Sequence, residues 1–326
     1  MASPVDRSVL AGLKGHDYLS CADLNSGQTR ALIELAAALK NKRHSIQLPG
    51  RILGLIFSKA STRTRVSFSV AIARLGGQTI DLLPTVTQVG RGEPVADTAR
   101  VLSRYCDALA IRTFAQSDLE SYAQWASIPV INALTDREHP CQALADFLTI
   151  AEAFAIAPDG VIDWQKLQGL SLAYIGDGNN VAHSLMLCGA LLGVNVRIGC
   201  PPDFSPDPTV LARARELAES GAQITVVHDP LEAVRGAQAL YTDVWASMGQ
   251  EEEQAERERA FAGWCLDEAL LSEADPRAIV LHCLPAHRGE EISAGVIEGS
   301  ASRVFDQAEN RLHAQQALLA TLLGGL

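Results

Sequence analysis

Short apolar runs that alternate with longer helical stretches constrain the fold of this chain more than any other feature. Several of the runs are almost continuously apolar, as expected for strands buried on both faces of a parallel sheet. The expected strands span 51–57, 78–83, 107–112, 129–133, 170–175, 194–199, 223–228, 239–242 and 278–283. Helical patterns lie between them, at 62–75, 97–105, 140–155, 180–192, 208–220 and 307–323. Strands joined through helices form βαβ units, so the sequence predicts an α/β fold with parallel sheets.

The expected strands fall into two sets, separated by the polar segment 156–169, which contains proline and glycine. A chain of 326 residues also exceeds one ordinary hydrophobic core. We therefore predict two doubly wound parallel-sheet domains linked by long helices, with residues 1–150 in the first domain and 151–306 in the second. The last helix, about 307–326, has one apolar face that could pack on either domain.

Composition and charge exclude several classes of protein. The apolar fraction of 48% and the charged fraction of 20% indicate a globular chain. A net charge of −11 argues against a nucleic-acid partner, although a few converging arginines could still bind a small anion. No apolar run approaches the ~18 residues that a membrane span requires, so no membrane association is expected.

Localisation is expected to be cytoplasmic. The opening residues MASPVDRSVL lack the apolar stretch of a secretory signal. The seven cysteines are scattered without CxxC spacing, which is typical of reduced thiols rather than of a disulfide framework or a zinc site. The highly charged run 251–260 is interpreted as a solvated helix face or loop.

Polar residues follow the predicted strands at their carboxyl ends, which is where open parallel sheets bind ligands. The densest group is Ser61-Thr62-Arg63-Thr64-Arg65. Ser61 is placed to cap a helix, whose free N–H groups and dipole would favour an anion. The hydroxyls and guanidinium groups add donors suited to phosphate oxygens. No GxxxxGK[ST] motif is present, so this is not the phosphate loop of a nucleoside triphosphatase.

Three further groups at strand ends have both a functional and a simpler interpretation. His139 precedes Pro140 at a helix start and could donate to a carbonyl oxygen, or it could only cap the helix. The segment 176–180, Gly-Asp-Gly-Asn-Asn, only partly matches a dinucleotide motif, and its asparagines either face a ligand or cap a helix. Cys283 is either a buried small apolar residue or part of a site.

His282, Cys283 and His287 could suggest a metal. However, their spacing at a strand end is expected to direct the side chains apart, so we predict no metal site.

Taken together, SxRTR at 61–65, HPxQ at 139–142 and HCLP at 282–285 resemble the aspartate/ornithine carbamoyltransferase family. The similarity extends from about Tyr18 to the final helix. The segment 243–249, Asp-Val-Trp-Ala-Ser-Met-Gly, is similar to the DxxxSMG motif of the ornithine-specific members. The resemblance implies transfer of the carbamoyl group from carbamoyl phosphate to the δ-amine of L-ornithine, giving L-citrulline and phosphate in arginine biosynthesis.

The resemblance also implies roles for individual residues. The first domain would bind carbamoyl phosphate and the second would bind ornithine, with the last helix returning to the first domain. The residues implied to bind carbamoyl phosphate are Ser61, Thr62, Arg63, Thr64, Gln88, Arg112, His139, Gln142, Cys283, Leu284 and Arg311. The residues implied to bind ornithine are Asn180, Asp243, Ser247 and Met248. The catalytic residues would be Cys283, Asp243, Arg112 and His139.

Assembly and alternative functions complete the expectations. The resemblance implies a homotrimer with sites at subunit interfaces, in which Gln88 reaches a neighbouring site, and it implies no metal or other cofactor. Other acceptors remain open, among them aspartate, N-acetylornithine and putrescine. A nicotinamide-dependent oxidoreductase built on the 176–180 segment and a catalytically silent anion-binding subunit are the alternatives from other classes.

Overall fold

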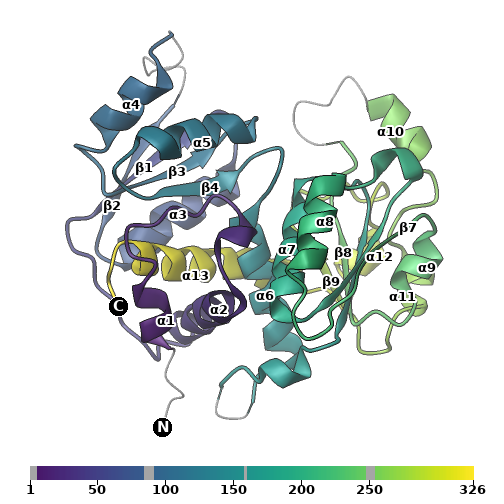
Figure 1. Ribbon diagram of the computed structural model, residues 1–326. Helices are drawn as coiled ribbons and strands as arrows, with labels where there is room; N and C mark the ends of the chain where they lie inside the picture. Colours follow the sequence, from purple (N-terminus) through teal and green to yellow (C-terminus); the bar gives the residue numbers. More distant parts are fainter. Residues whose placement is uncertain (1–5, 84–91, 158–159, 247–253) are drawn as a thin grey trace. The chain divides into compact units, whose positions relative to one another are not determined.

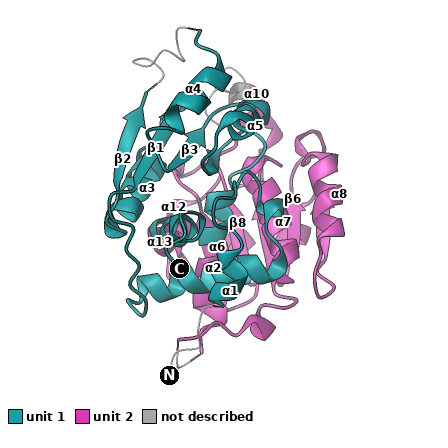
Figure 2. Cartoon of the chain, turned by 60° about the vertical axis from the view of Figure 1, so that its left-hand side comes forward, with its two compact units in different colours: residues 1–145, 310–326 teal, residues 146–309 magenta. Residues whose placement is uncertain are grey.

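The computed structural model describes residues 6–83, 92–157, 160–246 and 254–326. Their contacts divide them into two compact units (Figure 2). Unit 1 comprises residues 1–145 and 310–326, and unit 2 comprises residues 146–309. The chain passes between the units inside two helices, α6 (Pro140–Phe154) and α13 (Val304–Leu322).

Unit 1 is built on a four-stranded parallel sheet of order β2-β1-β3-β4. Its strands are β1 (Ile52–Phe57), β2 (Gln78–Leu82), β3 (Ala108–Arg112) and β4 (Val130–Leu134). Its helices are α1 (Arg7–Ala11), α2 (Ser26–Lys40), α3 (Thr62–Arg74), α4 (Val95–Leu102) and α5 (Gln116–Trp125), with the first part of α6 and the last part of α13. Figure 1 shows α4 and α5 on one side of this sheet and α3 and α13 on the other.

Unit 2 is built on a five-stranded parallel sheet of order β7-β6-β5-β8-β9. Its strands are β5 (Ser171–Ile175), β6 (Asn195–Gly199), β7 (Ile224–Val227), β8 (Ala239–Thr242) and β9 (Ile279–His282). Its helices are α7 (Asn180–Leu192), α8 (Pro208–Glu216), α9 (Pro230–Val234), α10 (Gln254–Ala260), α11 (Glu268–Ser272) and α12 (Ala294–Ile297). Helices α7 and α8 lie on one side of the sheet, with α9 and α11 on the other (Figure 1).

The inner strands of each sheet are buried as their apolar runs predict, whereas the edge strand β2 is largely exposed. One core cluster of unit 1 joins Ile56, Leu109 and Ile111 of the sheet to Leu119 and Tyr122 of α5. A larger cluster in unit 2 joins strand residues such as Ala173, Leu240 and Val280 to the helices beyond them. Burial on both faces explains why these strands read as continuous apolar runs rather than as alternating ones.

The predicted α/β fold with two parallel sheets is confirmed, and each of the nine expected strands is present within two residues of its expected ends. The helix predicted over 208–220 is shorter in the structure, because α8 ends at Glu216. The chain then turns with positive φ at Ser220 and Gly221. The sequence pattern also missed α2 and α5, which carry the buried residues Leu35 and Leu119.

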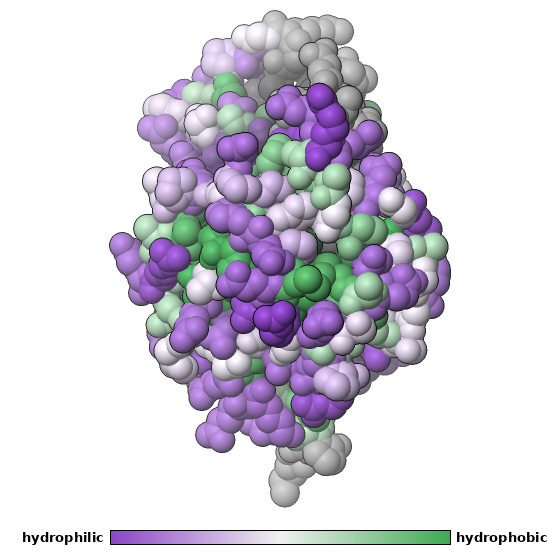
Figure 3. All heavy atoms as spheres, turned by 90° about the vertical axis from the view of Figure 1, so that its right-hand side faces the viewer, coloured by the Kyte–Doolittle hydropathy of each residue, from purple (hydrophilic) through white to green (hydrophobic). Residues whose placement is uncertain are grey.

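No helix in the described parts of the chain is both long and apolar enough to cross a membrane. On the side of α9 and α11, the surface is mostly hydrophilic and its apolar areas are small (Figure 3). Isolated apolar areas of this kind are normal on a protein surface.

Candidate active site

The polar residues singled out in the sequence lie at the carboxyl ends of parallel strands in both units. In unit 1, Ser61 follows β1, Arg112 ends β3 and His139 follows β4. In unit 2, Asn179 follows β5, Asp243 follows β8 and Cys283 follows β9. Because the strands of each sheet run parallel, each unit gathers its polar groups at one edge, which is the edge where ligands bind in such folds.

The start of α3 is arranged to receive an anion. The Ser61 hydroxyl accepts from the backbone N–H of Thr64 at 3.3 Å, which makes Ser61 the cap of a 13-residue helix. Thr62 and Arg63, in the first turn, are exposed, whereas Thr64 is buried. The helix dipole and the exposed guanidinium of Arg63 therefore combine at one helix end.

A buried arginine joins three segments of unit 1. Arg311 of α13 is only 5% exposed. Its Nη1 donates to Oε1 of Gln142 at 2.5 Å, and its Nη2 donates to Oγ1 of Thr64 at 3.1 Å. Arg311 and Thr64 are 247 residues apart in sequence, so only the folded chain places this cation beside the start of α3.

His139 is a buried, neutral imidazole at the start of α6. Pro140 occupies the first position of that helix, and the carbonyl of His139 accepts from the backbone N–H groups of Gln142 and Ala143. Burial lowers the pKa of His139 well below its ordinary value, and the positive charges of Arg311, Arg112 and Arg63 lower it further. The neutral ring can donate a hydrogen bond without adding to the positive charge of this edge.

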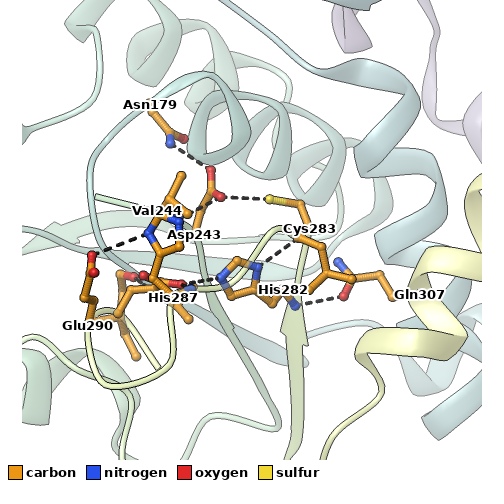
Figure 4. A network of polar contacts seen from close by, with 12 residues as sticks. Asn179, Asp243, Val244, His282, Cys283, His287, Glu290 and Gln307 are labelled. Carbon is orange, nitrogen blue, oxygen red and sulfur yellow. Dashed lines mark hydrogen bonds and ion pairs between the residues drawn. The ribbon is translucent and has the colours of Figure 1, made fainter. Parts of the chain in front are cut away.

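In unit 2, Asp243 is a buried carboxylate that accepts from three donors (Figure 4). Its Oδ2 accepts from Nδ2 of Asn179 at 3.0 Å. Its Oδ1 accepts from the backbone N–H of Val244 at 2.8 Å and from Sγ of Cys283 at 2.9 Å. The carboxylate is therefore fixed in orientation at the end of β8, while only 6% of the residue is exposed.

Cys283 is a protonated thiol in this arrangement. Burial raises its pKa well above the ordinary value, and the negative charge of Asp243 raises it further. The hydrogen bond requires the same state, because only a thiol can donate to a carboxylate. A thiolate at Cys283, which could act as a base, is thus disfavoured in this environment.

A second layer of contacts supports the residues after β9 (Figure 4). Nδ1 of His282 accepts from the backbone N–H of Leu284 at 2.9 Å, so the ring proton lies on Nε2. Nε2 is 3.1 Å from a carboxylate oxygen of the buried Glu291. The backbone N–H of His282 donates to Oε1 of Gln307. These contacts hold Leu284 at a φ of 59°, a conformation that nonglycine residues rarely adopt.

The two asparagines of the 176–180 segment have different places in the structure. Oδ1 of Asn179 accepts from the backbone N–H groups of Val181 and Ala182, so Asn179 caps α7 while its amide donates to Asp243. Asn180 is the first residue of α7 and is partly exposed. The contact between Asn179 and Asp243 could not be predicted from local patterns, because the two residues are 64 positions apart.

The 176–180 segment does not offer a dinucleotide site. A side-chain carbon at Gly178 would lie 2.3 Å from the backbone nitrogen of Pro206 and 2.6 Å from the backbone carbon of Ser205. Gly178 also donates to the carbonyl of Phe204 at 2.8 Å. The second glycine is therefore required for close packing of the chain on itself, and not for the approach of a pyrophosphate.

The charged run 251–260 is more than a solvated helix face. Its Arg257, in α10, is buried; it forms an ion pair with Asp177 at 2.7 Å and donates to the carbonyl of Trp245 at 2.8 Å. It thereby links the loop after β5 to the loop after β8. Sequence patterning missed this residue because its neighbours Glu256, Glu258 and Arg259 are exposed and dominate the pattern.

The side chains of His282, Cys283 and His287 were predicted to point apart. This prediction is wrong for His282 and Cys283. Ligand atoms of Asp243, His282 and Cys283 lie within 4.8 Å of one another, and His287 lies instead with Glu290 and Glu291. Both ring nitrogens of His282 and the thiol of Cys283 are already hydrogen-bonded within the protein. We assign no metal to this group.

Three residues implied by the resemblance lie outside the described residues: Gln88, Ser247 and Met248. The others divide between the units. Unit 1 holds Ser61, Thr62, Arg63, Thr64, Arg112, His139, Gln142 and Arg311. Unit 2 holds Asn180, Asp243, Cys283 and Leu284.

Comparison with known protein families gives two matches that together span most of the chain. Residues 16–152 match the aspartate/ornithine carbamoyltransferase carbamoyl-P binding domain. Residues 168–322 match the aspartate/ornithine carbamoyltransferase Asp/Orn binding domain.

Individual proteins are similar over nearly the full length. The chain is 70% identical over 319 residues to the ornithine carbamoyltransferase of Parasynechococcus marenigrum, covering 98% of this chain and 97% of that one. Among solved structures, the ornithine carbamoyltransferase of Gloeobacter violaceus is 54% identical with a TM-score of 0.84, covering 94% of this chain and 98% of its own. That of Pyrococcus furiosus is 46% identical with a TM-score of 0.89, covering 96% and 99%.

Proposed function

Because the chain belongs to the aspartate/ornithine carbamoyltransferase family, we propose that it transfers the carbamoyl group of carbamoyl phosphate to the δ-amine of L-ornithine. The products are L-citrulline and phosphate. The observation that carries the choice of acceptor is the buried Asp243 carboxylate, which lies in the part of the chain that matches the Asp/Orn binding domain. A fixed negative charge there suits a cationic diamine acid better than it suits aspartate.

We assign carbamoyl phosphate to the first domain, residues 1–150 with the final helix 307–326, and ornithine to the second, residues 151–306. On the donor side, the proposed phosphate ligands are Ser61, Thr62, Arg63 and Thr64, at the capped start of α3. Arg112, His139, Gln142 and Arg311 are proposed to complete the donor site, with Gln88 and the main chain at Cys283 and Leu284. On the acceptor side, the proposed ligands are Asn180, Asp243, Ser247 and Met248.

The reaction follows from these groups. The δ-nitrogen of ornithine forms a bond to the carbonyl carbon of carbamoyl phosphate, and the carbonyl oxygen becomes negative. Arg112 and the neutral ring of His139 donate to that oxygen, and one such donor typically contributes ~3 kcal/mol. The bond from carbon to the phosphate oxygen then breaks, and the departing phosphate takes the proton that the nitrogen releases. Arg63 and the first turn of α3 hold the phosphate as it leaves.

We propose that Asp243 orients the attacking amine and that Cys283 helps to orient Asp243. The carboxylate accepts from Asn179, Val244 and Cys283, which fixes the direction of its remaining lone pairs. An alkyl ammonium has a pKa of ~10.4, so most of the substrate amine is protonated at neutral pH and must lose this proton before it can attack. The amine therefore attacks in its neutral form.

The decisive experiment is an assay of citrulline formation from carbamoyl phosphate with L-ornithine, using aspartate, N-acetylornithine and putrescine in parallel. Citrulline formation with ornithine, and little product with the other amines, is expected. Preference for another amine would support a carbamoyltransferase of different specificity. Absence of turnover with every amine would support the catalytically silent alternative.

The kinetic response to pH should separate the two substrates. The lowered pKa of His139 means that its ring is already neutral near pH 7, so the KM for carbamoyl phosphate should stay level between about pH 5.5 and about pH 9. By contrast, kcat/KM for ornithine should rise towards alkaline pH as the amine deprotonates. Initial rates across this range measure both quantities; an inflection in the first curve near the ordinary pKa of histidine would contradict a neutral His139.

Replacing Cys283 by serine should reduce activity only modestly, because a hydroxyl can also donate to Asp243. We expect kcat/KM for ornithine to fall roughly tenfold, as for the weakening of one hydrogen bond to a charged group, with a smaller change for carbamoyl phosphate. Cys283→Ala, which removes the donor, should lose more. Cys265→Ser, at a partly exposed thiol outside the network, is the matched control. Equal losses for both substrates would contradict the placement of Cys283 beside the acceptor.

We also propose that the chain forms a homo-oligomer, specifically a trimer. In support, Val66 and Val70 of α3 and Ile80 of the edge strand β2 are exposed apolar residues on neighbouring elements. Exposed apolar side chains beside a sheet edge are typical of a protein interface. Light scattering of the purified protein measures the mass, and a monomer of 34.8 kDa would contradict this proposal.

A cytoplasmic, biosynthetic role completes the proposal. None of the seven cysteines forms a disulfide, which agrees with a reducing compartment. One solved relative, from Campylobacter jejuni, is described as an anabolic ornithine carbamoyltransferase and is 37% identical to this chain. The proposed physiological direction is therefore towards citrulline, for arginine biosynthesis.

A further inference from the structure

Glu138 is a buried carboxylate that the proposed reaction does not use. It immediately precedes His139 and is 2% exposed, although glutamate is among the residues least often buried. Burial raises its pKa, so its environment stabilises the charge incompletely. A costly group in this position requires an explanation from its contacts.

The contacts of Glu138 lead to the N-terminal segment of unit 1. Its Oε1 accepts from the hydroxyl of Ser20 at 2.5 Å, and its Oε2 accepts from the backbone N–H of Cys21 at 3.0 Å. These residues are 118 and 117 positions away in sequence. Both carboxylate oxygens are thus bound to one segment that is remote in the chain.

That segment is itself fixed to the sheet. Tyr18 forms a parallel bridge with Ile131 of β4, the strand at one edge of the sheet. The amide of Asn132 donates to the carbonyl of Leu19 at 2.8 Å, and Asp17 accepts from the backbone N–H of Val130 at 2.7 Å. Residues 17–21 therefore provide a rigid support along the edge of β4.

The other end of the connection is the turn that carries His139. The backbone N–H of Thr135 donates to the carbonyl of Glu138 at 2.9 Å, and the hydroxyl of Thr135 accepts from the backbone N–H of Glu138 at 3.2 Å. Residues 135–138 thus close into a compact turn between β4 and α6. The side chain of Glu138 links this turn directly to the N-terminal segment.

We propose that Glu138 is a positioning residue for His139: by binding Ser20 and Cys21, it holds the 135–138 turn so that the imidazole keeps its place at the start of α6. This inference rests on the proposed function, in which His139 donates to the carbonyl oxygen of carbamoyl phosphate. A histidine displaced even slightly would lose that hydrogen bond while the ornithine ligands stayed unchanged.

The test compares steady-state kinetics of five proteins with the wild type: E138A, S20A, S20T, the double variant E138A/S20A, and the control E120Q. Glu120 lies exposed on α5, so E120Q is a control for the loss of a carboxylate at the surface of the same unit. Citrulline formation gives KM for each substrate, and calorimetric titration with carbamoyl phosphate alone gives its affinity independently of ornithine. Thermal unfolding is recorded for each protein.

Three results are expected. First, E138A and S20A should lower kcat/KM for carbamoyl phosphate roughly tenfold, as for the loss of a hydrogen bond to a charged group, with KM for ornithine nearly unchanged. Second, S20T, which keeps the hydroxyl, should restore most of the activity. Third, the double variant should lose less than the sum of the two single losses, because each single variant already removes the contact between Glu138 and Ser20.

Other outcomes would overturn the inference. If folded E138A and S20A matched the wild type in both KM values and in kcat, the contact would have no role in positioning. If only the melting temperature fell, or both substrates lost affinity alike, its role would be purely structural. A wild-type protein that formed no citrulline and bound no carbamoyl phosphate would instead refute the proposed function, so the two failures are distinguishable.

Discussion

Replacing Asp243 by asparagine should lower kcat/KM for ornithine by roughly 10²–10³-fold, the loss expected when one partner of a buried charge pair is removed. The variant keeps the shape of the side chain but removes the negative charge that faces the cationic substrate. It also places an NH₂ group where the carboxylate now accepts from Asn179 or from Cys283. One donor would then face another donor, so the orientation of the group should be lost with its charge.

Initial-rate kinetics with each substrate varied in turn measure this effect. The affinity for carbamoyl phosphate, measured by calorimetry in the absence of ornithine, should stay close to that of the wild type. Asp203→Asn is the matched control, because it makes the same chemical change at an exposed position of unit 2. An Asp243→Asn variant with normal use of ornithine would refute the assignment of Asp243 to the acceptor.

Replacing Arg311 by methionine should have the largest effect on carbamoyl phosphate, with kcat/KM lowered roughly 10²-fold or more. The change removes a buried cation and leaves the side chains of Gln142 and Thr64 without their donor. It also removes one of the charges that lower the pKa of His139, so that pKa should rise towards its ordinary value.

Two variants make this result specific. Arg311→Lys keeps the charge but cannot donate to Gln142 and Thr64 from one planar group, so it should recover only part of the activity. Arg74→Met makes the same substitution at an exposed site at the end of α3 and should behave like the wild type. Titration of the imidazole by NMR follows His139 directly. If Arg311→Met kept its affinity for carbamoyl phosphate, the donor site would have to lie elsewhere.

The strands were predictable because a buried strand is a run of apolar residues that are neighbours in the sequence. Parallel strands covered on both faces are apolar throughout, so runs such as 170–175 and 278–283 could be recognised as strands. The start of α3 was also predictable as a capped helix, since Ser61 and Thr64 are three residues apart and their contact is local. Helix α2 was missed although it begins with a capping box of Asn25 and Gln28, which is a local signal of a helix start. Helix α5 was missed because its apolar positions are mixed with polar ones and no side chain caps it.

The contacts between distant residues were not predictable in the same way. Nothing local to Glu138 indicates that its carboxylate binds Ser20, and nothing local to Arg257 indicates that it binds Asp177. The same holds for the state of Cys283, whose pKa depends on burial and on a carboxylate 40 residues away. Charge and burial at such positions are properties of the surroundings and not of the residue type.

The sequence alone determined the class of fold, the order of the strands along the chain and the motifs that mark the strand ends, because apolar periodicity, helix caps and turns depend on residues close together in the chain. Only the tertiary structure decided which distant side chains meet: Arg311 with Thr64 and Gln142, and Asn179 and Cys283 with Asp243. The physical reason is that hydrogen bonds and pKa shifts act over a few ångströms in space, and the folded chain alone sets those distances.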